Sequence, residues 1–274
     1  MTAPLRQTYL LVVFLLISLG ISVYLLLDSP DFIDESGASW IIKEKEARSR
    51  LLSIPILLYH NIDGTGPFSI DFGVIREHFR ILKNKGIRVI PLTELINRLE
   101  NPVPFNDRVV VITFDDGYLS MHTKLVPLVE EFEYPVTLFV YVDNINQKSR
   151  KMLSWDLLRQ LDSKGIDIQC HTISHADLTR YSRRTDYESR RKLFDEIYMS
   201  KRIMERHMGK EIQFFAFPYG RYDLELIHLA ELSGYRRVFS TDYGSNILTR
   251  NNYCLRRQHI KKSYSNAYIE SLVE

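Results

Sequence analysis

Cysteine is scarce in this sequence of 274 residues, where only Cys170 and Cys254 are present. Two cysteines exclude a disulfide framework and a zinc site built from cysteine alone, and we expect the pair to be unbonded. An excess of one charge is also missing, since 36 Lys and Arg residues stand against 34 Asp and Glu residues, a net charge of +2. This balance argues against nucleic acid as the main partner. With 45% hydrophobic and 26% charged residues, the composition excludes disorder and collagen-like or low-complexity architectures.

Long apolar runs are absent except near the N-terminal end, where residues 9–27 contain no charged side chain. A helix over this run would be about 28 Å long, close to the hydrocarbon thickness of a bilayer. Arg6 precedes the run and four acidic residues follow it within 28–35, which predicts a cytoplasmic segment 1–8, a membrane anchor 9–27 and an extracytoplasmic remainder. A cleaved signal peptide is the alternative, but its apolar core usually has only ~7–15 residues. Residues 28–53 are polar and indicate a linker.

From residue 54 onward, short apolar runs alternate with longer amphipathic segments, which indicates one domain over 54–274. The predicted strands are 54–59, 87–90, 108–113, 136–142, 166–170, 213–217 and 236–240. The predicted helices are 74–85, 94–99, 118–132, 155–163, 186–208 and 224–232. Strands that alternate with helices imply parallel βαβ units, hence an α/β fold with an open doubly wound sheet or a barrel. In both, the chemistry lies at the carboxyl ends of the strands.

The strongest signal is the pair Asp115 and Asp116, which ends a buried strand just before Gly117. On an extended segment these neighbouring side chains point in opposite directions, so one can bind a cation while the other faces a water or a substrate. An ordinary helix cap and turn is the alternative interpretation. A second strand end carries His171 and His175, whose spacing allows both rings to converge on one ion. Two histidines and a carboxylate are typical of a catalytic divalent metal site.

Two further strand ends complete the candidate site. Pro218, Tyr219 and Gly220 predict a tight loop whose backbone N–H groups can serve as oxyanion donors, although an ordinary turn would use the same residues. His60 follows the first predicted strand. A lone histidine is more often structural than catalytic, but this position suits proton transfer.

These motifs together resemble a known family. Residues 113–118 (TFDDGY), 171–175 (HTISH) and 217–220 (FPYG) are similar, in order and spacing, to the first three motifs of the polysaccharide deacetylases, carbohydrate esterase family 4 with the NodB homology domain. The resemblance extends from about residue 54 to the C-terminus. Residues 55–62 and 79–86 resemble the branch that contains the biofilm poly-β-1,6-N-acetylglucosamine N-deacetylases, in which the motifs are rearranged.

The resemblance implies a distorted (β/α)7 barrel and a metal-dependent hydrolysis of N-acetyl groups on a sugar polymer. Asp116, His171 and His175 would bind the metal, and Asp115 would act as general base on the metal-bound water. The backbone N–H of Tyr219 would help to bind the oxyanion. Zinc is the expected metal, although two imidazoles and a carboxylate also suit cobalt, nickel or iron.

An amine leaves poorly unless it is protonated, so the reaction also needs a general acid. The rearranged branch implies His60, and the more usual order of the family implies His259; we favour His60 because the first-strand segment matches the branch. Many members carry an arginine two residues before the proline of the third motif, where this sequence has Ala216, and Arg257 is a candidate replacement. The predicted substrate-binding residues are Pro218, Tyr219, Trp155, Asp156 and Arg257. For Trp155, a structural role at a helix start is the alternative.

The sequence leaves the glycan open. Poly-β-1,6-N-acetylglucosamine is favoured, with peptidoglycan, chitin oligomers or an O-acetylated glycan as alternatives. A membrane-tethered glycan-binding protein without turnover is the alternative from another class, although the intact Asp115, Asp116, His171 and His175 set argues against it. We expect a single-pass protein of a bacterial cell membrane with an extracytoplasmic catalytic domain, and an exopolysaccharide synthesis or export complex as a further partner.

Overall fold

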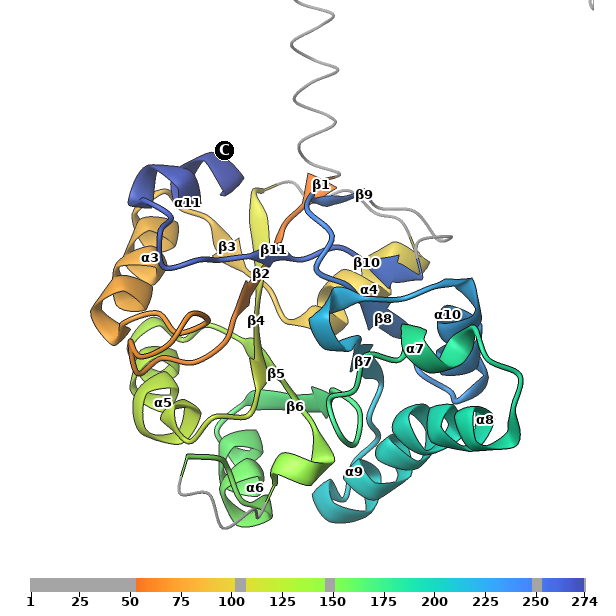
Figure 1. Cartoon of the computed structure of the whole chain (residues 1–274). Helices are drawn as coiled ribbons and strands as arrows, with labels where there is room; N and C mark the ends of the chain where they lie inside the picture. Colours follow the sequence, from red (N-terminus) through yellow and green to blue (C-terminus); the bar gives the residue numbers. More distant parts are fainter. Residues whose placement is uncertain (1–52, 102–106, 146–150, 248–252, 274) are drawn as a thin grey trace, which may run out of the picture. The chain divides into compact units, whose positions relative to one another are not determined.

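The computed structural model describes residues 53–101, 107–145, 151–247 and 253–273 (Figure 1). All of them belong to the compact unit Arg50–Glu274. The predicted segments 1–8 and 9–27, and almost all of the linker 28–53, lie outside the described residues. Among the residues that are described, no helix is both long and apolar enough to cross a membrane.

The domain is an α/β structure built around one curled sheet of parallel strands (Figure 1). The strands are β1 (Ser53–Ile54), β2 (Ile56–Tyr59), β3 (Arg88–Val89), β4 (Val109–Asp116), β5 (Val136–Val140), β6 (Ile166–Cys170), β7 (Phe214–Ala216), β8 (Arg237–Phe239), β9 (Asn246–Ile247), β10 (Cys254–Leu255) and β11 (Gln258–His259). The main sheet has the order β10-β8-β7-β6-β5-β4-β2-β11, with β3 paired to the start of β4. Strands β1 and β9 form a separate antiparallel pair.

The sheet curls until its two edges nearly meet. β10 and β11 lie at opposite ends of the strand order, yet only Arg256 and Arg257 separate them in the sequence. Both edge strands are parallel to their single neighbours, and no described strand joins one edge to the other by a ladder. The predicted distorted (β/α)7 barrel is therefore confirmed in its coarser form, as a curled α/β half-barrel of parallel strands. A two-residue connection brings its two edges together, and no ladder between described strands pairs them. Two-residue strands such as β10 and β11 are too short to give a sequence signal.

Helices cover the outside of the curl, except for α4, which closes one end of its inside. They are α3 (Phe72–Asn84), α4 (Leu92–Glu100), α5 (Val126–Phe132), α6 (Trp155–Ser163), α7 (Thr179–Ser182), α8 (Tyr187–Phe194), α9 (Ser200–Met208), α10 (Leu224–Leu232) and α11 (Asn266–Val273). Two π-helical turns, η1 (Met121–Leu125) and η3 (Asp195–Met199), precede α5 and α9, and two 3₁₀ turns are η2 (Val142–Asn144) and η4 (Pro218–Gly220). The helical segment predicted at 118–132 therefore begins at Met121, three residues later than predicted. The segment predicted as one helix at 186–208 contains the π turn η3 in its middle.

The core has two layers, one on each face of the sheet. Because side chains alternate along a strand, Val110 and Ile112 of β4 pack outward against the helices, whereas Val109 and Val111 face the inside of the curl. The inner layer is filled at one end by the apolar face of α4, including Leu95. The other end, where the parallel strands finish, is left to polar side chains.

Candidate metal centre and catalytic site

β4 brings two carboxylates to the carboxyl edge of the sheet. Asp115 continues the inward alternation of Val109 and Val111 and is buried. Asp116 would face outward on a regular strand, but its φ of 80° lies in the left-handed region and turns the chain. Gly117 follows with a φ of 81°, and a Cβ there would approach Val140 within 2.9 Å, which favours glycine. Both carboxylates consequently line the same cavity.

His171 and His175 reach this cavity from the loop after β6. His171 is buried, and its Nδ1 lies 2.7 Å from the carbonyl oxygen of Ala216. A proton on Nδ1 donates to that carbonyl and leaves the Nε2 lone pair free for a cation. His175 adopts a φ of 57°, and its backbone N–H donates to Thr172 Oγ1 over 3.0 Å. The sharp turn between the two residues directs both rings to one place.

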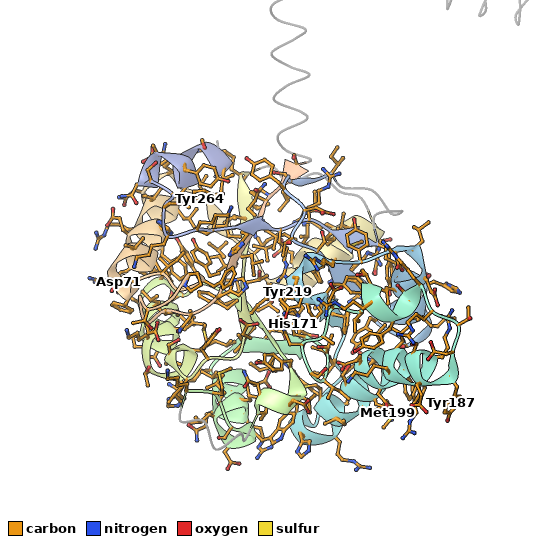
Figure 2. All side chains as sticks on the ribbon, viewed as in Figure 1. Asp71, His171, Tyr187, Met199, Tyr219 and Tyr264 are labelled. Carbon is orange, nitrogen blue, oxygen red and sulfur yellow. The ribbon has the colours of Figure 1, made fainter. Side chains whose placement is uncertain are left out.

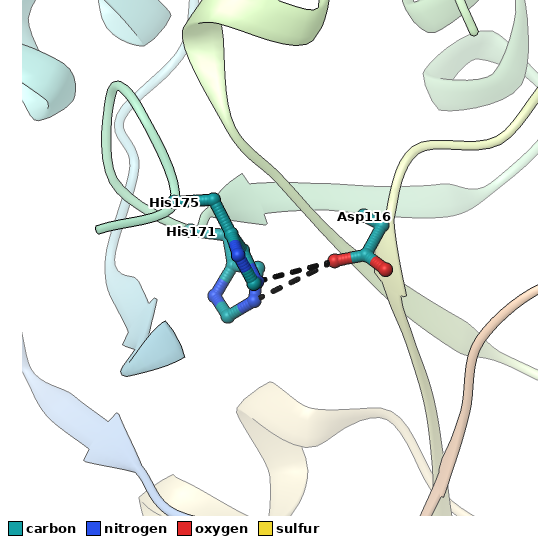
Figure 3. A group of neighbouring side chains, drawn as sticks. All are labelled: Asp116, His171 and His175. Atoms are coloured by element: carbon teal, nitrogen blue, oxygen red, sulfur yellow. Dashed lines mark ion pairs between the residues drawn. The ribbon is translucent and has the colours of Figure 1, made fainter. Parts of the chain in front are cut away.

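Asp116, His171 and His175 form a compact group of three ligands (Figure 3). Asp116 Oδ1 lies 3.5 Å from His175 Nε2 and 3.9 Å from His171 Nε2, and one ligand atom from each residue lies within 4.8 Å of the others. Asp116 Oδ1 is buried and has no hydrogen-bond partner among the described residues. This carboxylate oxygen and the two imidazoles fit a divalent ion that would lie ~2.0–2.2 Å from each ligand atom.

The pKa values of Asp116, His171 and His175 also favour a metal site. Burial and then the charge of Asp115 raise the pKa of Asp116 to about 7, so this carboxyl needs a cation beside it to stay ionised. Burial lowers the pKa of His171 to about 3 and also lowers the pKa of His175. Both rings are therefore neutral at pH 7, which is the form that binds metals.

Asp115 is held by a different partner. Burial raises its pKa, but the charge and hydrogen bonds of Arg257, together with His171 and His60, outweigh burial and lower the pKa to about 2. The guanidinium of Arg257 donates from both terminal nitrogens to the two carboxylate oxygens over 2.8 Å each, and its Nε donates to Ser240 O. Arg257 is fully buried between the two edges of the sheet. Arg257 thus places a positive charge beside Asp115, which Ala216 cannot do. The backbone carbonyl of Ala216 instead accepts a hydrogen bond from His171.

The two candidate acids are neighbours. The rings of His60 and His259 lie 4.9 Å apart, and Phe68 contacts both, at 5.6 Å and 5.8 Å between ring centroids. Burial lowers the pKa of His60 to about 4, against the opposing effect of Asp115, and burial also lowers the pKa of His259. His60 Nδ1 is buried and finds no hydrogen-bond partner in the part of the chain that the structure describes, which leaves it available to a ligand in the cavity.

The loop after β7 forms the opposite wall. Tyr219 is 60% exposed, and its ring meets that of His175 edge-on at 4.7 Å. Gly220 packs so closely on Thr241 that a Cβ would lie 2.1 Å from Thr241 Oγ1. Pro218, the first residue of the η4 turn in this loop, is buried. Five described residues other than glycine have a positive φ, and four of them lie at this site: Asp116, Thr172, His175 and Tyr219. Backbone strain is therefore concentrated around the site.

These residues enclose a cavity of about 290 Å³. Its lining is His60, Phe68, Asp115, Asp116, His171, His175, Phe217, Tyr219, Thr241 and His259. A second cavity of about 550 Å³ adjoins it at Phe68, and a third of about 430 Å³ adjoins it at Tyr219. In the side-chain view, His171 and Tyr219 lie near the middle of the domain, whereas Asp71, Tyr187 and Tyr264 lie at its periphery (Figure 2).

The structure does not bring Trp155 and Asp156 to this cavity. Trp155 is buried at the start of α6 and stacks on His207 at 4.1 Å, and Asp156 is exposed and paired with Arg159. Neither residue lines the site or the two adjoining cavities. The position of Trp155 matches the alternative interpretation, a structural role at the start of a helix. Sequence reasoning missed Phe68 and Thr241, because each lies in an irregular segment without a periodic or motif signal.

The comparison with known families identifies the domain. The polysaccharide deacetylase family model matches residues 103–238. The Bacillus subtilis (strain 168) protein YxkH, whose name assigns it to the polysaccharide deacetylases, is 26% identical over 246 residues, which cover 87% of this chain and 82% of that protein. The poly-beta-1,6-N-acetyl-D-glucosamine N-deacetylase of Escherichia coli (strain K12) is 22% identical over 226 residues, which cover 68% of this chain but 33% of that protein.

Solved structures share the fold. The Streptococcus pyogenes deacetylase PplD, in complex with acetate, superposes with a TM-score of 0.71 at 21% identity, over 81% of this chain and 98% of that one. IcaB from Ammonifex degensii superposes with a TM-score of 0.69 at 18% identity, over 81% of this chain and 97% of that one. The curled parallel half-barrel described above is thus a deacetylase-type fold.

Proposed function

Because this chain carries a polysaccharide deacetylase domain, of a family of hydrolases that act on amide bonds, we propose that it removes N-acetyl groups from an extracellular polysaccharide that contains N-acetylglucosamine. The observation that carries the proposal is the adjacency of two units. One is the ligand group Asp116, His171 and His175, and the other is the buried pair of Asp115 and Arg257. His171 Nε2 lies 3.8 Å from Asp115 Oδ2, so both units face the same small volume.

Asp116, His171 and His175 would bind the divalent ion on which the family depends. When bound, the ion, for which zinc is our first choice and cobalt, nickel or iron are alternatives, supplies Lewis acidity toward a water and toward the acetyl carbonyl. The chain contributes two neutral imidazoles and the carboxylate of Asp116, oriented by the hydrogen bond of His171 to Ala216 O.

Asp115 is the proposed general base. Its pKa of about 2 keeps it ionised at neutral pH, and its two hydrogen bonds from Arg257 fix the direction of the carboxylate. It takes a proton from the attacking water, and the backbone N–H of Tyr219 would donate to the oxyanion. His60 is the proposed general acid that protonates the leaving nitrogen, with His259 as the alternative. Because burial lowers the pKa of His60 to about 4, its ring is neutral at pH 7 and would first take up the proton released by the attacking water.

The substrate is proposed to be a chain of sugars rather than a single one. The central cavity adjoins larger cavities on both sides, and Phe68 and Tyr219 present exposed rings at the two junctions. Apolar sugar faces pack on such aromatic surfaces. Poly-β-1,6-N-acetylglucosamine is our first choice, supported by the distant similarity to the E. coli enzyme, and peptidoglycan, chitin oligomers and O-acetylated glycans are alternatives. We further propose that residues 9–27 anchor the chain in a bacterial cell membrane, with the domain 54–274 outside and 28–53 as a linker, where an export complex would deliver the polymer.

Acetate release tests this function. The full chain is incubated with β-1,6-linked N-acetylglucosamine oligomers, with chitin oligomers and with peptidoglycan, before and after treatment with a chelator. We expect release that the chelator abolishes and added zinc or cobalt restores. Release from another glycan would keep the chemistry and replace the substrate, whereas a metal-loaded protein that releases nothing from any glycan would favour the binding-protein alternative.

A further inference from the structure

The loop that carries the two histidine ligands holds an unfavourable backbone conformation. Thr172 and His175 both have positive φ, at 79° and 57°. Such a residue is strained and persists only where its surroundings hold it. The hydrogen bond from His175 N–H to Thr172 Oγ1 is internal to the loop. Anchors from other elements are therefore needed to keep both imidazoles on one point.

Two elements anchor the loop from outside. The backbone N–H groups of Val142 and Asp143 in η2 donate to Thr172 O and Ile173 O over 3.1 Å and 2.8 Å, and Glu196 is the side chain that binds the N–H groups of the loop. Its Oε2 accepts from the backbone N–H groups of Ile173 and Ser174, over 2.8 Å and 2.9 Å. Its Oε1 accepts from the Ser174 hydroxyl and lies 2.7 Å from Lys192 Nζ. The two middle residues of the loop are thus bound through their backbone to one carboxylate, directly between His171 and His175.

The position of Glu196 is unusual for a glutamate. Its side chain is fully buried, although glutamate is rarely buried unless it is paired. It lies on η3, the π-helical turn that interrupts the long predicted helix between α8 and α9. Such a turn inserts a residue and redirects the side chains around it, and π turns are frequent at functional sites. Burial raises the pKa of Glu196, but the hydrogen bonds from Lys192 and Ser174 outweigh it and lower the pKa, so the group is ionised at pH 7.

We propose that Glu196 is a positioning residue for the metal centre, which binds the backbone of the loop 171–175 so that His171 and His175 are held ready for the ion. The inference rests on the proposed function, since it requires that this group of ligands binds a metal. Glu196 itself touches neither the substrate nor the ion. Its charge matters because four donors converge on it, and a neutral amide would turn its NH₂ group toward one pair of them.

Glu205 offers a matched control. It lies on α9, is largely buried, and pairs with Lys201 over 2.8 Å and with Arg202 over 2.7 Å. It contacts no residue of the loop 171–175 in the described part of the chain. The substitutions Glu196→Gln and Glu205→Gln therefore each remove one paired helical carboxylate, but only the first loosens the loop.

The test is the affinity of the full chain for Zn²⁺, measured by competition with a chromogenic chelator, with the Co²⁺ absorption spectrum as a second readout. For Glu196→Gln we expect the dissociation constant to rise by roughly 10- to 100-fold, with an altered Co²⁺ spectrum. For Glu205→Gln we expect the affinity and the spectrum of the unchanged protein, even where the melting temperatures of the two metal-free variants fall equally. Acetate release by Glu196→Gln should recover at high zinc concentration.

Two results would overturn the inference while leaving the function intact. One is wild-type affinity in Glu196→Gln, and the other is an equal loss of affinity in both variants. If the unchanged chain binds neither ion, the metal centre of the proposed function is itself wrong. Ser174→Ala gives a milder variant should Glu196→Gln fail to fold, because it removes the hydroxyl contacts to Glu196 and Lys192 and keeps both backbone contacts to Glu196. It should weaken zinc binding by a smaller factor, and unchanged affinity there would count against the inference.

Discussion

The two halves of the site are supported in opposite ways. On the β4 side, Arg257 donates to the side chain of Asp115, which is 142 residues away in the sequence. On the β6 side, Glu196 accepts from the backbone of a loop about 22 residues away. Each support is a single buried charge, but the first sets the protonation of a reactive group and the second sets the place of two ligands.

This difference separates electrostatic control from geometric control. Loss of Arg257 leaves a carboxylate buried without its counter-charge, so the damage reaches both the proton transfer and the fold. Loss of Glu196 leaves the ligands chemically unchanged and allows them to move, so the damage falls first on the affinity for metal. Variants in the two halves should therefore give different patterns of lost activity, lost metal and lost stability.

The largest effect is expected when the base is separated from the ligands. Asp115→Asn should lower kcat by roughly 10²- to 10⁴-fold and leave zinc bound, because an amide cannot accept the proton of the water. His171→Ala and His175→Ala should lose zinc together with activity. Acetate release and the zinc content of the purified variants measure both properties. Full zinc occupancy in both alanine variants would remove these histidines from the ligand set.

A second prediction concerns stability on the β4 side. Arg257→Met should reduce the free energy of unfolding by about 3–5 kcal/mol, because it leaves Asp115 buried and unpaired. Arg76→Met is the control, since Arg76 pairs with Glu131 over 2.7 Å with both side chains well exposed, and such pairs contribute about 0–1 kcal/mol. Urea unfolding of the metal-free proteins at pH 7 measures the difference. Equal losses in both variants would contradict the special role of the buried pair.

The strand ends of the site could be predicted from sequence because short motifs mark them. The alternation of valines that stops at Asp115, the spacing of His171 and His175, and the Pro-Tyr-Gly turn all lie in local patterns, and the predicted strand 166–170 matches β6. The structure brings these residues to one cavity, as parallel strands with a common carboxyl edge require.

What could not be predicted depends on contacts between distant segments. Glu196 is one of many acidic residues on helices, and only the π turn of η3 directs it inward. Nothing local shows that Trp155 stacks on His207 instead of facing a sugar. The edge strands that carry Arg257 into the curl have two residues each, too few for any periodic signal.

A third prediction distinguishes the two histidines that face the ligands. His60→Ala should lower kcat for an N-acetylated sugar by roughly 10²-fold, and His259→Ala should lower it less. The reason is the leaving amine, which needs a proton. With p-nitrophenyl acetate, whose leaving group needs none, His60→Ala should keep most of its activity while Asp115→Asn loses it. The reverse ranking of the two histidine variants would make His259 the acid.

The smallest expected effect is a dependence of stability on pH on the β6 side. The pKa of Glu196 is lower in the folded chain than the ~4.3 of an unfolded glutamate, because the contacts from Lys192 and Ser174 outweigh burial. A carboxylate with a depressed pKa stabilises the fold above its unfolded pKa, and this contribution is lost as the pH falls through the folded pKa. The difference in free energy of unfolding between the metal-free wild type and Glu196→Gln should therefore be constant from pH 7 to about pH 5 and shrink below about pH 4. Urea unfolding at each pH gives the difference, and one that stays constant down to pH 3 would mean that Glu196 holds the loop by shape alone, without its charge.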